Sequence, residues 1–455
     1  MSLLGLLLRW DEVEETFSDR ARVQGMLDFE AALARAEARS GVIPASAATA
    51  IEACCGMNRY DLAALAREAT LAGNLAIPLV RQLTMLVREQ DAEAARFVHW
   101  GATSQDTVDT GLVLQLRAAL ETIESELDRL SDVLASLADE HRATPIAGRT
   151  WMQHAVPTTF GMKAAAWLDA ILRQREACAG LRERALVLQL GGAVGTLATL
   201  GDSGAAVAAA LAAELRLPLP DLAWHTERDR MADVAATLGR CVGTLGKIAR
   251  DLALHGQTEV AELFEPAVEG RGGSSSMPHK QNPVAAAVVL AAATRAPGLV
   301  ATMLSAMVQE DERGLGGWHA EWETLPDLVG LAGGALHQLT DAMAGLRVDT
   351  ARMAANLEAT RGLVFAEAVQ MAVAEKAGRA AAQRLLEAAC RRAQSEGLHL
   401  REVLAADPTV SRHVPTDELE RLFDPRRYVA VTGPLIDRVL ARHAAARAAP
   451  RGGTA

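Results

Sequence analysis

The sequence predicts an all-α protein built around a central bundle of long helices. Alanine and leucine dominate the 455 residues, and runs of β-branched residues are few. Prolines are absent from 79–144, 158–217, 221–265 and 327–407, which leaves room for long uninterrupted helices. Within 231–252, apolar residues recur at alternating steps of three and four, the heptad spacing of a helix packed lengthwise against others. The sequence shows neither a βαβ rhythm nor an alternating hairpin pair, so helices are expected throughout.

Three helical units follow one another along the chain. Residues 1–108 are expected to form an N-terminal helical domain, because the first long helix begins near residue 108. Residues 109–346 then form the central bundle, beginning with the periodic segment 109–141. Residues 347–455 form a C-terminal helical domain that contains the periodic segment 365–397 and ends in an Ala/Arg/Gly tail, which we expect to be frayed.

Three glycines interrupt the heptad helix, namely Gly239, Gly243 and Gly246. Each costs about 1 kcal/mol of helix stability relative to alanine. We expect close approach of a neighbouring helix to offset this cost.

Composition and charge exclude several classes of protein. The net charge is −11 and no basic stripe is present, which argues against nucleic-acid binding. The five cysteines are odd in number and lack paired spacing, so we expect reduced thiols in a cytoplasmic protein. The N-terminus has no basic region or cleavage site, and no apolar run approaches the ~20 residues that span a bilayer. Metal-binding spacings such as HExxH and CxxC are absent, so neither a metal nor another cofactor is predicted.

Polar stretches marked by glycine or charge interrupt the helical pattern and are the candidate functional segments. They are HWGATSQDTVDT (99–110), GRTWMQHAVPTT (148–159), LGGAVGTLATLG (190–201), GRGGSSSMPHKQNP (270–283) and QEDERGLGGWHAEWE (309–323).

The 270–283 segment carries the strongest chemical signal. Two glycines give its backbone freedom, and backbone N–H groups ahead of a proline-started helix could hold an anion. Lys280 supplies a cation and Asn282 an amide, and both stand between Pro278 and Pro283. The alternative is a flexible serine-rich linker, but two rigid prolines on either side of a charged residue are not expected in a flexible linker.

Two other segments have plain structural explanations. Thr103 or Ser104 ahead of Asp106 is typical of a helix N-cap. The 190–201 segment resembles a phosphate loop, but its glycine spacing is incomplete and no βαβ context supports a dinucleotide site.

Together these segments resemble the fumarase/aspartase superfamily over essentially the whole chain. The signature loop of that superfamily, G-S-S-x-M-P-x-K-x-N-P, is matched at every specified position by residues 273–283. GATSQDTVDT and GRTWMQHAVPTTFG resemble the two other regions that build its active site. The resemblance implies a three-domain fold with a central long-helix bundle. It also implies a homotetramer whose sites are shared between subunits.

Within the superfamily, the likeness is strongest to the bacterial 3-carboxy-cis,cis-muconate cycloisomerase branch. The stretches that carry this likeness include FSDRARVQGMLDFEAALARAEA, AGNLAIPLV, WHTERDR and GLGGWHAEWETLPD. This likeness implies closure of 3-carboxy-cis,cis-muconate to 4-carboxymuconolactone in the protocatechuate branch of aromatic catabolism.

One departure from the superfamily favours this branch over the eliminating lyases. Those lyases typically carry a proton-relaying histidine after GRT, where this sequence has Trp151. An indole only donates a hydrogen bond and cannot relay a proton. A cycloisomerase can dispense with that group, because the attacking or leaving group is the substrate's own weakly basic carboxylate.

The resemblance also assigns candidate site residues. It implies that Ser274, Lys280 and Asn282 are catalytic, with Ser274 as the proton carrier. The substrate is polyanionic, so cations and hydrogen-bond donors are expected around it. The candidate substrate-binding residues are Asn74, Thr103, Ser104, Arg149, Trp151, Gln153, His154, His225, Arg228, Ser275 and Arg313.

Several alternatives stay open at this point. Arg149 could be a buried structural arginine, and the roles of His99 and His154 are undecided. The substrate could be 3-sulfomuconate, or the enzyme could be an adenylosuccinate- or argininosuccinate-type lyase. A crystallin-like scaffold is the non-enzymatic alternative, which an intact Ser274, Lys280 and Asn282 disfavours.

Overall fold

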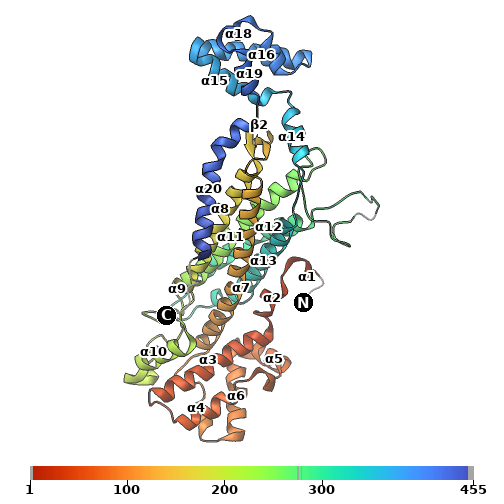
Figure 1. Ribbon diagram of the computed structural model, residues 1–455. Helices are drawn as coiled ribbons and strands as arrows, with labels where there is room; N and C mark the ends of the chain where they lie inside the picture. Colours follow the sequence, from red (N-terminus) through yellow and green to blue (C-terminus); the bar gives the residue numbers. More distant parts are fainter. Residues whose placement is uncertain (1–3, 274–275, 278, 449–455) are drawn as a thin grey trace.

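The computed structural model describes residues 4–273, 276–277 and 279–448, and it is almost entirely helical (Figure 1). The all-α prediction is therefore confirmed. A long bundle occupies the middle of the molecule, with one group of short helices at each end.

Five long helices form the bundle. They are α7 (Ser104–Glu140), α8 (Phe160–Ala179), α11 (Asp229–His255), α12 (Val284–Ala306) and α13 (Gly317–Ala344). The seven heptad positions of α11 are at most 2% exposed, as their spacing predicted. A Cβ at Gly239 would lie 2.5 Å from Val300, and one at Gly246 would lie 2.7 Å from Ala293. The expected close approach thus occurs between α11 and α12, whereas Gly243 has no atom within 4 Å of that position.

The first 103 residues contribute the lower group in Figure 1 and a short arm beside the bundle. The elements are α1 (Gly5–Leu8), α2 (Asp11–Glu15), α3 (Asp19–Arg39), α4 (Ala45–Glu52), η1 (Met57–Arg59), α5 (Leu62–Ala72), α6 (Ala76–Gln90) and η2 (Ala94–Phe97). Leu27, Ile51 and Leu79 belong to a core of this group, while Phe29 and Leu33 of α3 join the core of the bundle. The start of α7 is therefore held between two cores.

A β-hairpin joins α7 to α8. Strands β1 (Pro145–Thr150) and β2 (Gln153–Thr159) pair antiparallel across a two-residue turn. A hairpin was not predicted from the sequence, and the prediction of helices throughout is wrong here. The turn is Trp151–Met152 instead of Asn-Gly or Asp-Gly, and each strand contains a proline, so the usual hairpin signals are missing. A second, two-residue pairing joins β3 (Leu263–Phe264) to β4 (Arg347–Val348).

Shorter helices complete the middle of the chain. They are α9 (Leu181–Arg184), η3 (Ala198–Ser203) and α10 (Gly204–Leu215). Helix α10 contacts α3 at the lower end.

The C-terminal group has a core of its own around Phe365, Val369, Leu386 and Leu404. Its elements are α14 (Thr350–Glu358), η4 (Leu363–Phe365), α15 (Ala366–Ala377), α16 (Arg379–Glu396), α17 (Leu400–Ala405), α18 (Pro408–His413) and α19 (Thr416–Leu422). The periodic segment 365–397 is divided at Gly378, whose φ of 81° breaks the helix.

The last helix returns to the bundle. Helix α20 (Arg426–Ala448) runs beside α8 (Figure 1), and only Ile436 is buried among its described residues. An ion pair between Arg442 and Asp169 at 2.7 Å and a hydrogen bond between His443 and Asp132 at 2.9 Å hold it in place. The expected fraying of the tail is therefore wrong for 441–448, and 449–455 lie outside the described residues. We propose that the boundaries at 108 and 346 stand, with α20 assigned to the bundle.

Helix α12 is unusually apolar. Among the described residues it alone has the length and mean hydropathy of a membrane span, which the sequence analysis does not anticipate. Arg295 and Pro297 interrupt it, and it packs mainly against α11 and α13. Core helices of soluble proteins meet the same criterion, although this helix is only 33% buried in one chain, and a single such helix is weak evidence for a membrane protein.

Burial of one carboxyl predicts a pH-dependent stability. Glu37 is 1% exposed and its Oε1 has no partner among the described residues. Burial, with a smaller contribution from Glu30, raises the pKa of Glu37 to about 9. A raised carboxyl pKa gives stability that is fully present below the unfolded pKa near 4.5 and is lost as the pH rises toward 9.

Glu37→Gln should therefore stabilise the protein at neutral and alkaline pH. The amide mimics the protonated acid, so we expect a gain of less than about 1 kcal/mol at pH 5 and of about 4 kcal/mol at pH 8. Chemical unfolding at both pH values measures this, with exposed Glu89→Gln as control. A gain of the same size at pH 5 and pH 8 would contradict the explanation.

Candidate functional site

The predicted site residues lie in three places on one chain. The first is the α7 start, formed by Asn74, Thr103, Ser104, His225, Arg228 and Arg313. The second is the β1–β2 hairpin, which carries Arg149, Trp151, Gln153 and His154. The third is the signature loop, residues 270–283.

The α7 start is organised by Asp106. Thr103 is the N-cap residue of α7, as its sequence predicted, and its N–H donates to Asp106 at 3.0 Å. The same buried carboxylate accepts from Gly191 N and Gly192 N at 3.0 and 2.9 Å. These glycine N–H groups, which resembled a phosphate loop, are therefore occupied by the protein's own carboxylate. Ser104 follows as the first residue of the helix.

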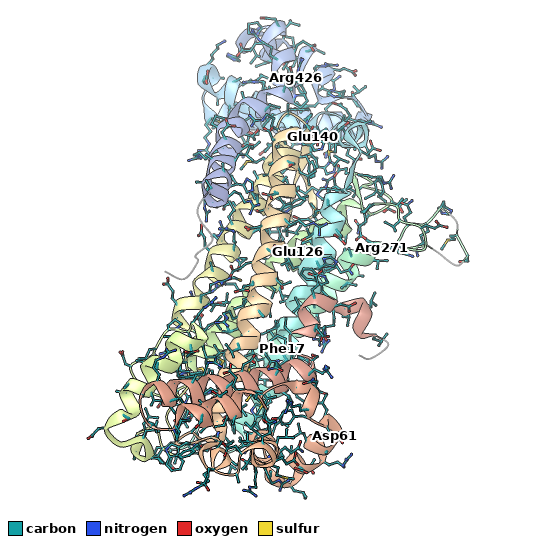
Figure 2. The ribbon with its side chains drawn as sticks, turned by 60° about the horizontal axis from the view of Figure 1, so that its bottom comes forward. Phe17, Asp61, Glu126, Glu140, Arg271 and Arg426 are labelled. Atoms are coloured by element: carbon teal, nitrogen blue, oxygen red, sulfur yellow. The ribbon has the colours of Figure 1, made fainter. Side chains whose placement is uncertain are left out.

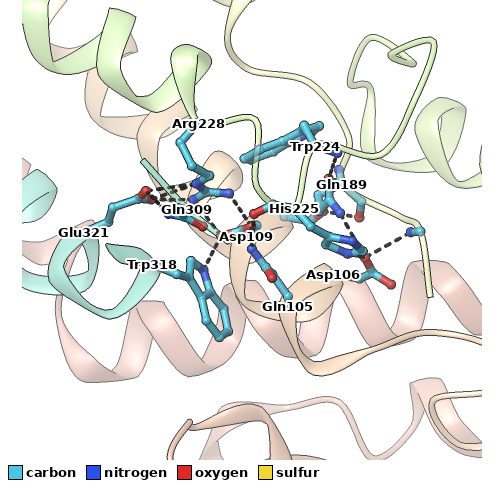
Figure 3. Close-up of polar contacts among 12 residues, drawn as sticks. Gln105, Asp106, Asp109, Gln189, Trp224, His225, Arg228, Gln309, Trp318 and Glu321 are labelled. Carbon is cyan, nitrogen blue, oxygen red and sulfur yellow. Dashed lines mark hydrogen bonds and ion pairs between the residues drawn. The ribbon is translucent and has the colours of Figure 1, made fainter. Parts of the chain in front are cut away.

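His225 and Arg228 are buried beside the first turns of α7, where they meet Asp106 and Asp109 (Figure 3). His225 is 3% exposed and its Nε2 lies 2.9 Å from Asp106. Arg228 is 2% exposed, and its guanidinium donates to Asp109 at 2.7 Å and to Glu321 at 2.9 Å. Its donors are thus shared between two buried carboxylates. We therefore revise the expected substrate-binding role of Arg228 to one of holding α7, α11 and α13 together.

Arg313 and Asn74 stand at the edge of this group. Arg313 is partly exposed and donates to the carbonyl of Ala193 at 2.9 Å. The side chain of Asn74 accepts from Ile77 N at 3.2 Å, which caps the start of α6. Leu75, the next residue, lines a small apolar cavity together with Val108 of α7.

His99 also has a structural partner. Its Nδ1 lies 2.7 Å from Glu30, which also accepts from Thr107 at 2.9 Å. Burial lowers the pKa of His99, but the adjacent Glu30 outweighs this, so the net direction is upward. His99 therefore joins α3 to the start of α7.

At the hairpin, Arg149 pairs with a buried carboxylate. Its two terminal nitrogens donate to Glu262 at 3.0 and 2.7 Å, and Glu262 is fully buried. His255 and Asn356 contact the same carboxylate at 2.6 and 2.7 Å. Burial alone would raise the pKa of Glu262, but these hydrogen bonds lower it to about 2. Arg149, which is 20% exposed, is therefore oriented by Glu262 at the surface.

The neighbouring polar groups of the hairpin are less constrained. His154 is half-buried, and its Nδ1 has no partner among the described residues. Burial, followed by the charge of Arg149, lowers the pKa of His154. Gln153 is exposed on β2. Lys163, in the first turn of α8, also has its pKa lowered by burial.

Trp151 stands at the tip of the hairpin and is 97% exposed in the isolated chain. It has φ 51° and Met152 has φ 66°, the left-handed conformation that two-residue turns usually give to Asn-Gly. Such a conformation costs a non-glycine residue roughly 1–2 kcal/mol. The exposed indole of Trp151 therefore stands on a turn whose backbone conformation is strained.

The signature loop projects sideways from the bundle, with Arg271 near its base (Figure 2). Asn282 N donates to Gly272 O at 2.8 Å, and Gly273 pairs with Gln281, which closes the base of the loop. Lys280 and Asn282 line a cleft with Phe264 and Arg271. The predicted residues Ser274 and Ser275 lie outside the described residues.

The expected anion site at the start of α12 is filled by the protein itself. Glu265 accepts from Ala285 N and Ala286 N at 3.0 and 2.8 Å. This carboxylate satisfies the helix N-terminus and ties the loop to α12. We therefore withdraw the interpretation of that helix end as an anion site.

The α7 start lies far from the other two groups within one chain. The 37 residues of α7 separate the α7 start from the hairpin, a length of about 55 Å. The 23 residues of α12 lead from the signature loop toward the lower end, about 35 Å away. Figure 1 shows β2 near the top and the first residues of α7 near the bottom. One chain alone therefore does not bring the α7 start to the hairpin or to the signature loop, whereas Glu262, bound to Arg149, is three residues from Glu265 at the base of that loop.

One cluster of possible metal ligands occurs among the described residues. Glu126, His337 and Asp341 lie close together midway along the bundle. Arg129 already pairs with Glu126 at 2.9 Å and with Asp341 at 2.7 Å. The arginine supplies the positive charge that a metal would bring, so the cluster is explained without one.

Comparison with known proteins assigns the family. The lyase family model matches residues 8–298, and the adenylosuccinate lyase C-terminus model matches residues 362–439. The chain belongs to the fumarase/aspartase superfamily.

Similar members of this superfamily align over nearly their full length. A 3-carboxy-cis,cis-muconate cycloisomerase of Pseudomonas aeruginosa is 57% identical over 94% of this chain and 93% of its own. The crystal structure of 3-carboxy-cis,cis-muconate lactonizing enzyme from Pseudomonas putida superposes with a TM-score of 0.93 at 51% identity, covering 98% of this chain and 100% of that chain. A nitrosuccinate lyase of Streptomyces davaonensis is 44% identical over 94% of this chain and 92% of its own.

Two residues that organise these groups were not singled out as site residues from the sequence. Asp106 was noted only beside a helix cap, and Glu262 carried no signal because its partners are distant in the sequence. Only the repeated glycines at 191–192 hinted that backbone N–H groups there meet an anion.

Proposed function

We propose that this enzyme closes 3-carboxy-cis,cis-muconate to 4-carboxymuconolactone. The observation that carries the proposal is full-length similarity to enzymes of that name, at 57% and 51% identity. Trp151 at the position of the relay histidine agrees with it, because intramolecular carboxylate addition needs no such relay.

The reaction forms one C–O bond and one C–H bond. A substrate carboxylate oxygen adds to the diene, and the displaced electron pair moves onto the neighbouring carboxylate, giving an aci-carboxylate. A proton then reaches the carbon next to that carboxylate. We assign its delivery to Ser274 or to a water that Ser274 orients. Lys280 and Asn282 stabilise the charge that develops, as fixed cations and donors do in such sites.

We further propose a cytoplasmic homotetramer with shared sites. The hairpin, the α7 start and the signature loop would then meet from different subunits. The separation of these groups along α7 and α12 supports this, as do the apolar α12 and the open position at Gly243. Thr103, Ser104, His225 and Arg313 would face the substrate with Arg149, Gln153, His154 and Ser275. Asn74, which lies just before α6, would contribute a further hydrogen bond to the substrate.

The decisive experiment follows the loss of diene absorbance for the muconates and the release of fumarate for the succinates, with purified enzyme. 3-Carboxymuconate should be consumed much faster than 3-sulfomuconate, adenylosuccinate or argininosuccinate. Nitrosuccinate is a necessary further substrate, because a nitrosuccinate lyase is 44% identical to this chain. Faster release of fumarate from any of the succinates than lactone formation from the muconate would refute the proposal.

Trp151→Phe should preserve lactonisation and weaken substrate binding. The indole is suited to packing against the flat diene, and phenylalanine keeps an aromatic face while losing one donor. We expect KM to rise several-fold while kcat changes little. Steady-state kinetics of the variant on 3-carboxymuconate measure both constants.

Trp151→His serves as the matched variant. It should not create strong lyase activity on fumarate or adenylosuccinate, because the surrounding pocket is unchanged. A collapse of kcat in Trp151→Phe with unchanged KM and intact folding would instead mean that Trp151 acts in the transition state.

A further inference from the structure

We infer that Asp106 is a positioning residue that fixes one wall of the proposed active site. It acts through Thr103, the 189–192 segment and His225, and the inference rests on the proposed function. The carboxylate is buried, and it accepts more hydrogen bonds than the one or two that a helix cap requires.

Asp106 collects five donors from three separate segments. Thr103 N reaches one carboxylate oxygen, Oδ2, which also accepts from Gly192 N. The other oxygen, Oδ1, accepts from Gly191 N, from Gln189 Nε2 at 3.2 Å and from His225 Nε2. A buried carboxylate is stable only when it is hydrogen-bonded in this way. The network therefore fixes the three segments relative to one another (Figure 3).

The contact with Asp106 also selects the state of His225. A carboxylate only accepts hydrogen bonds, so the ring nitrogen that faces it, Nε2, must carry a proton. When the ring is neutral, Nδ1 is then the acceptor. The glycine loop is shaped around this ring, because a Cβ at Gly191 would lie 2.8 Å from Cε1 of His225. Asp106 thus sets both the tautomer and the orientation of the imidazole.

The same loop connects Asp106 to Arg313. Arg313 donates to the carbonyl of Ala193, which directly follows the two glycines bound to Asp106. Thr226, next to His225, donates to the carbonyl of Asp311 at 2.8 Å. A shift of the loop would therefore move Arg313 as well as His225. Four proposed substrate contacts, Thr103, Ser104, His225 and Arg313, depend on one buried carboxylate.

Asp106→Asn tests this inference. The amide keeps the volume but turns an NH₂ group toward donors, so the loop should lose its fixed position. We expect kcat/KM on 3-carboxymuconate to fall up to about 100-fold, mainly through KM, because small misplacements of binding groups have effects of this size. The matched control is Asp128→Asn, a buried carboxylate of the same helix that pairs with Arg175 and Arg447 away from these segments. It should lower stability without changing KM.

A double-mutant cycle separates positioning from general destabilisation. If Asp106 acts through His225, the losses in kcat/KM should not multiply. The combined Asp106→Asn/His225→Gln variant should then retain at least about fivefold more kcat/KM than the product of the two single losses predicts. Asp128→Asn combined with His225→Gln should instead be multiplicative. Multiplicative losses for Asp106 and His225 would overturn the inference.

Two further measurements test the role of Asp106 without relying on enzymatic activity or on the folding of Asp106→Asn. Amide hydrogen exchange over 188–197 should accelerate in Asp106→Asn and not in Asp128→Asn, and unchanged exchange would overturn the inference. If Asp106→Asn does not fold, Gly191→Ala displaces the same loop while leaving the carboxylate, and it should raise KM in the same way. If the wild-type enzyme does not consume the muconate, the proposed function fails, and hydrogen exchange still decides the role of Asp106.

Discussion

Ser274→Ala should abolish lactonisation while leaving the fold intact. Loss of the proton-carrying hydroxyl is expected to reduce kcat by at least about a thousandfold, as removal of a central catalytic group does in other enzymes. Catalytic residues on glycine-rich loops contribute little to core packing, so the substitution should change the free energy of unfolding by no more than about 0.5 kcal/mol. Stopped-flow and steady-state absorbance of the diene measure the first quantity, and chemical unfolding measures the second.

Ser276→Ala is the matched control for this prediction. Ser276 lies in the same loop at the position that the superfamily signature leaves open. The control should therefore keep activity close to that of the wild-type enzyme. Near-normal turnover by Ser274→Ala would mean that another group carries the proton, and Lys280 would then be the first candidate.

Local patterns in the sequence predict most of the helices, because helix periodicity reports directly on burial. The seven heptad residues of α11 are buried, and two of its three glycines meet α12 closely. The same logic misses the β1–β2 hairpin. Trp151 and Met152 adopt positive φ without the glycine or asparagine that normally marks such a turn. A strained turn of this kind is held by its surroundings, which a local pattern does not contain.

The partners of the charged site residues were not predictable for a related reason. Arg149 and Glu262 are 113 positions apart, and Arg228 lies 93 positions from Glu321. Only the three-dimensional packing brings these charges together. The resemblance to the superfamily identifies the segments of the site, but it does not show which of their cations are already neutralised. Arg228 is therefore reassigned, whereas Lys280 and Arg313 form no ion pair within 4.0 Å of another described residue.

Mixing two inactive variants should restore activity if each site is built from several chains. We choose Ser274→Ala for the signature loop and the double substitution Thr103→Val/Ser104→Ala for the α7 start. The length of α12, roughly 35 Å, lies between the described base of the signature loop and the lower end of the bundle in one chain. The signature loop and the α7 start can act on one substrate molecule only when they come from different subunits. Each variant alone should be nearly inactive.

After denaturation and refolding together, an equal mixture should recover about a quarter of the wild-type activity, because each of the two contributing chains is wild-type at its position in half of the sites. A chain that carries all three substitutions is the control, since mixing it with either variant creates no site with both intact segments. Light scattering and mass spectrometry of differently tagged chains must first verify a tetramer and exchange of subunits. With exchange verified, absence of rescue would mean that the α7 start and the signature loop of one chain serve the same site. The chain would then have to bend or close across the length of α12, which the continuous packing of α12 against α11 and α13 opposes.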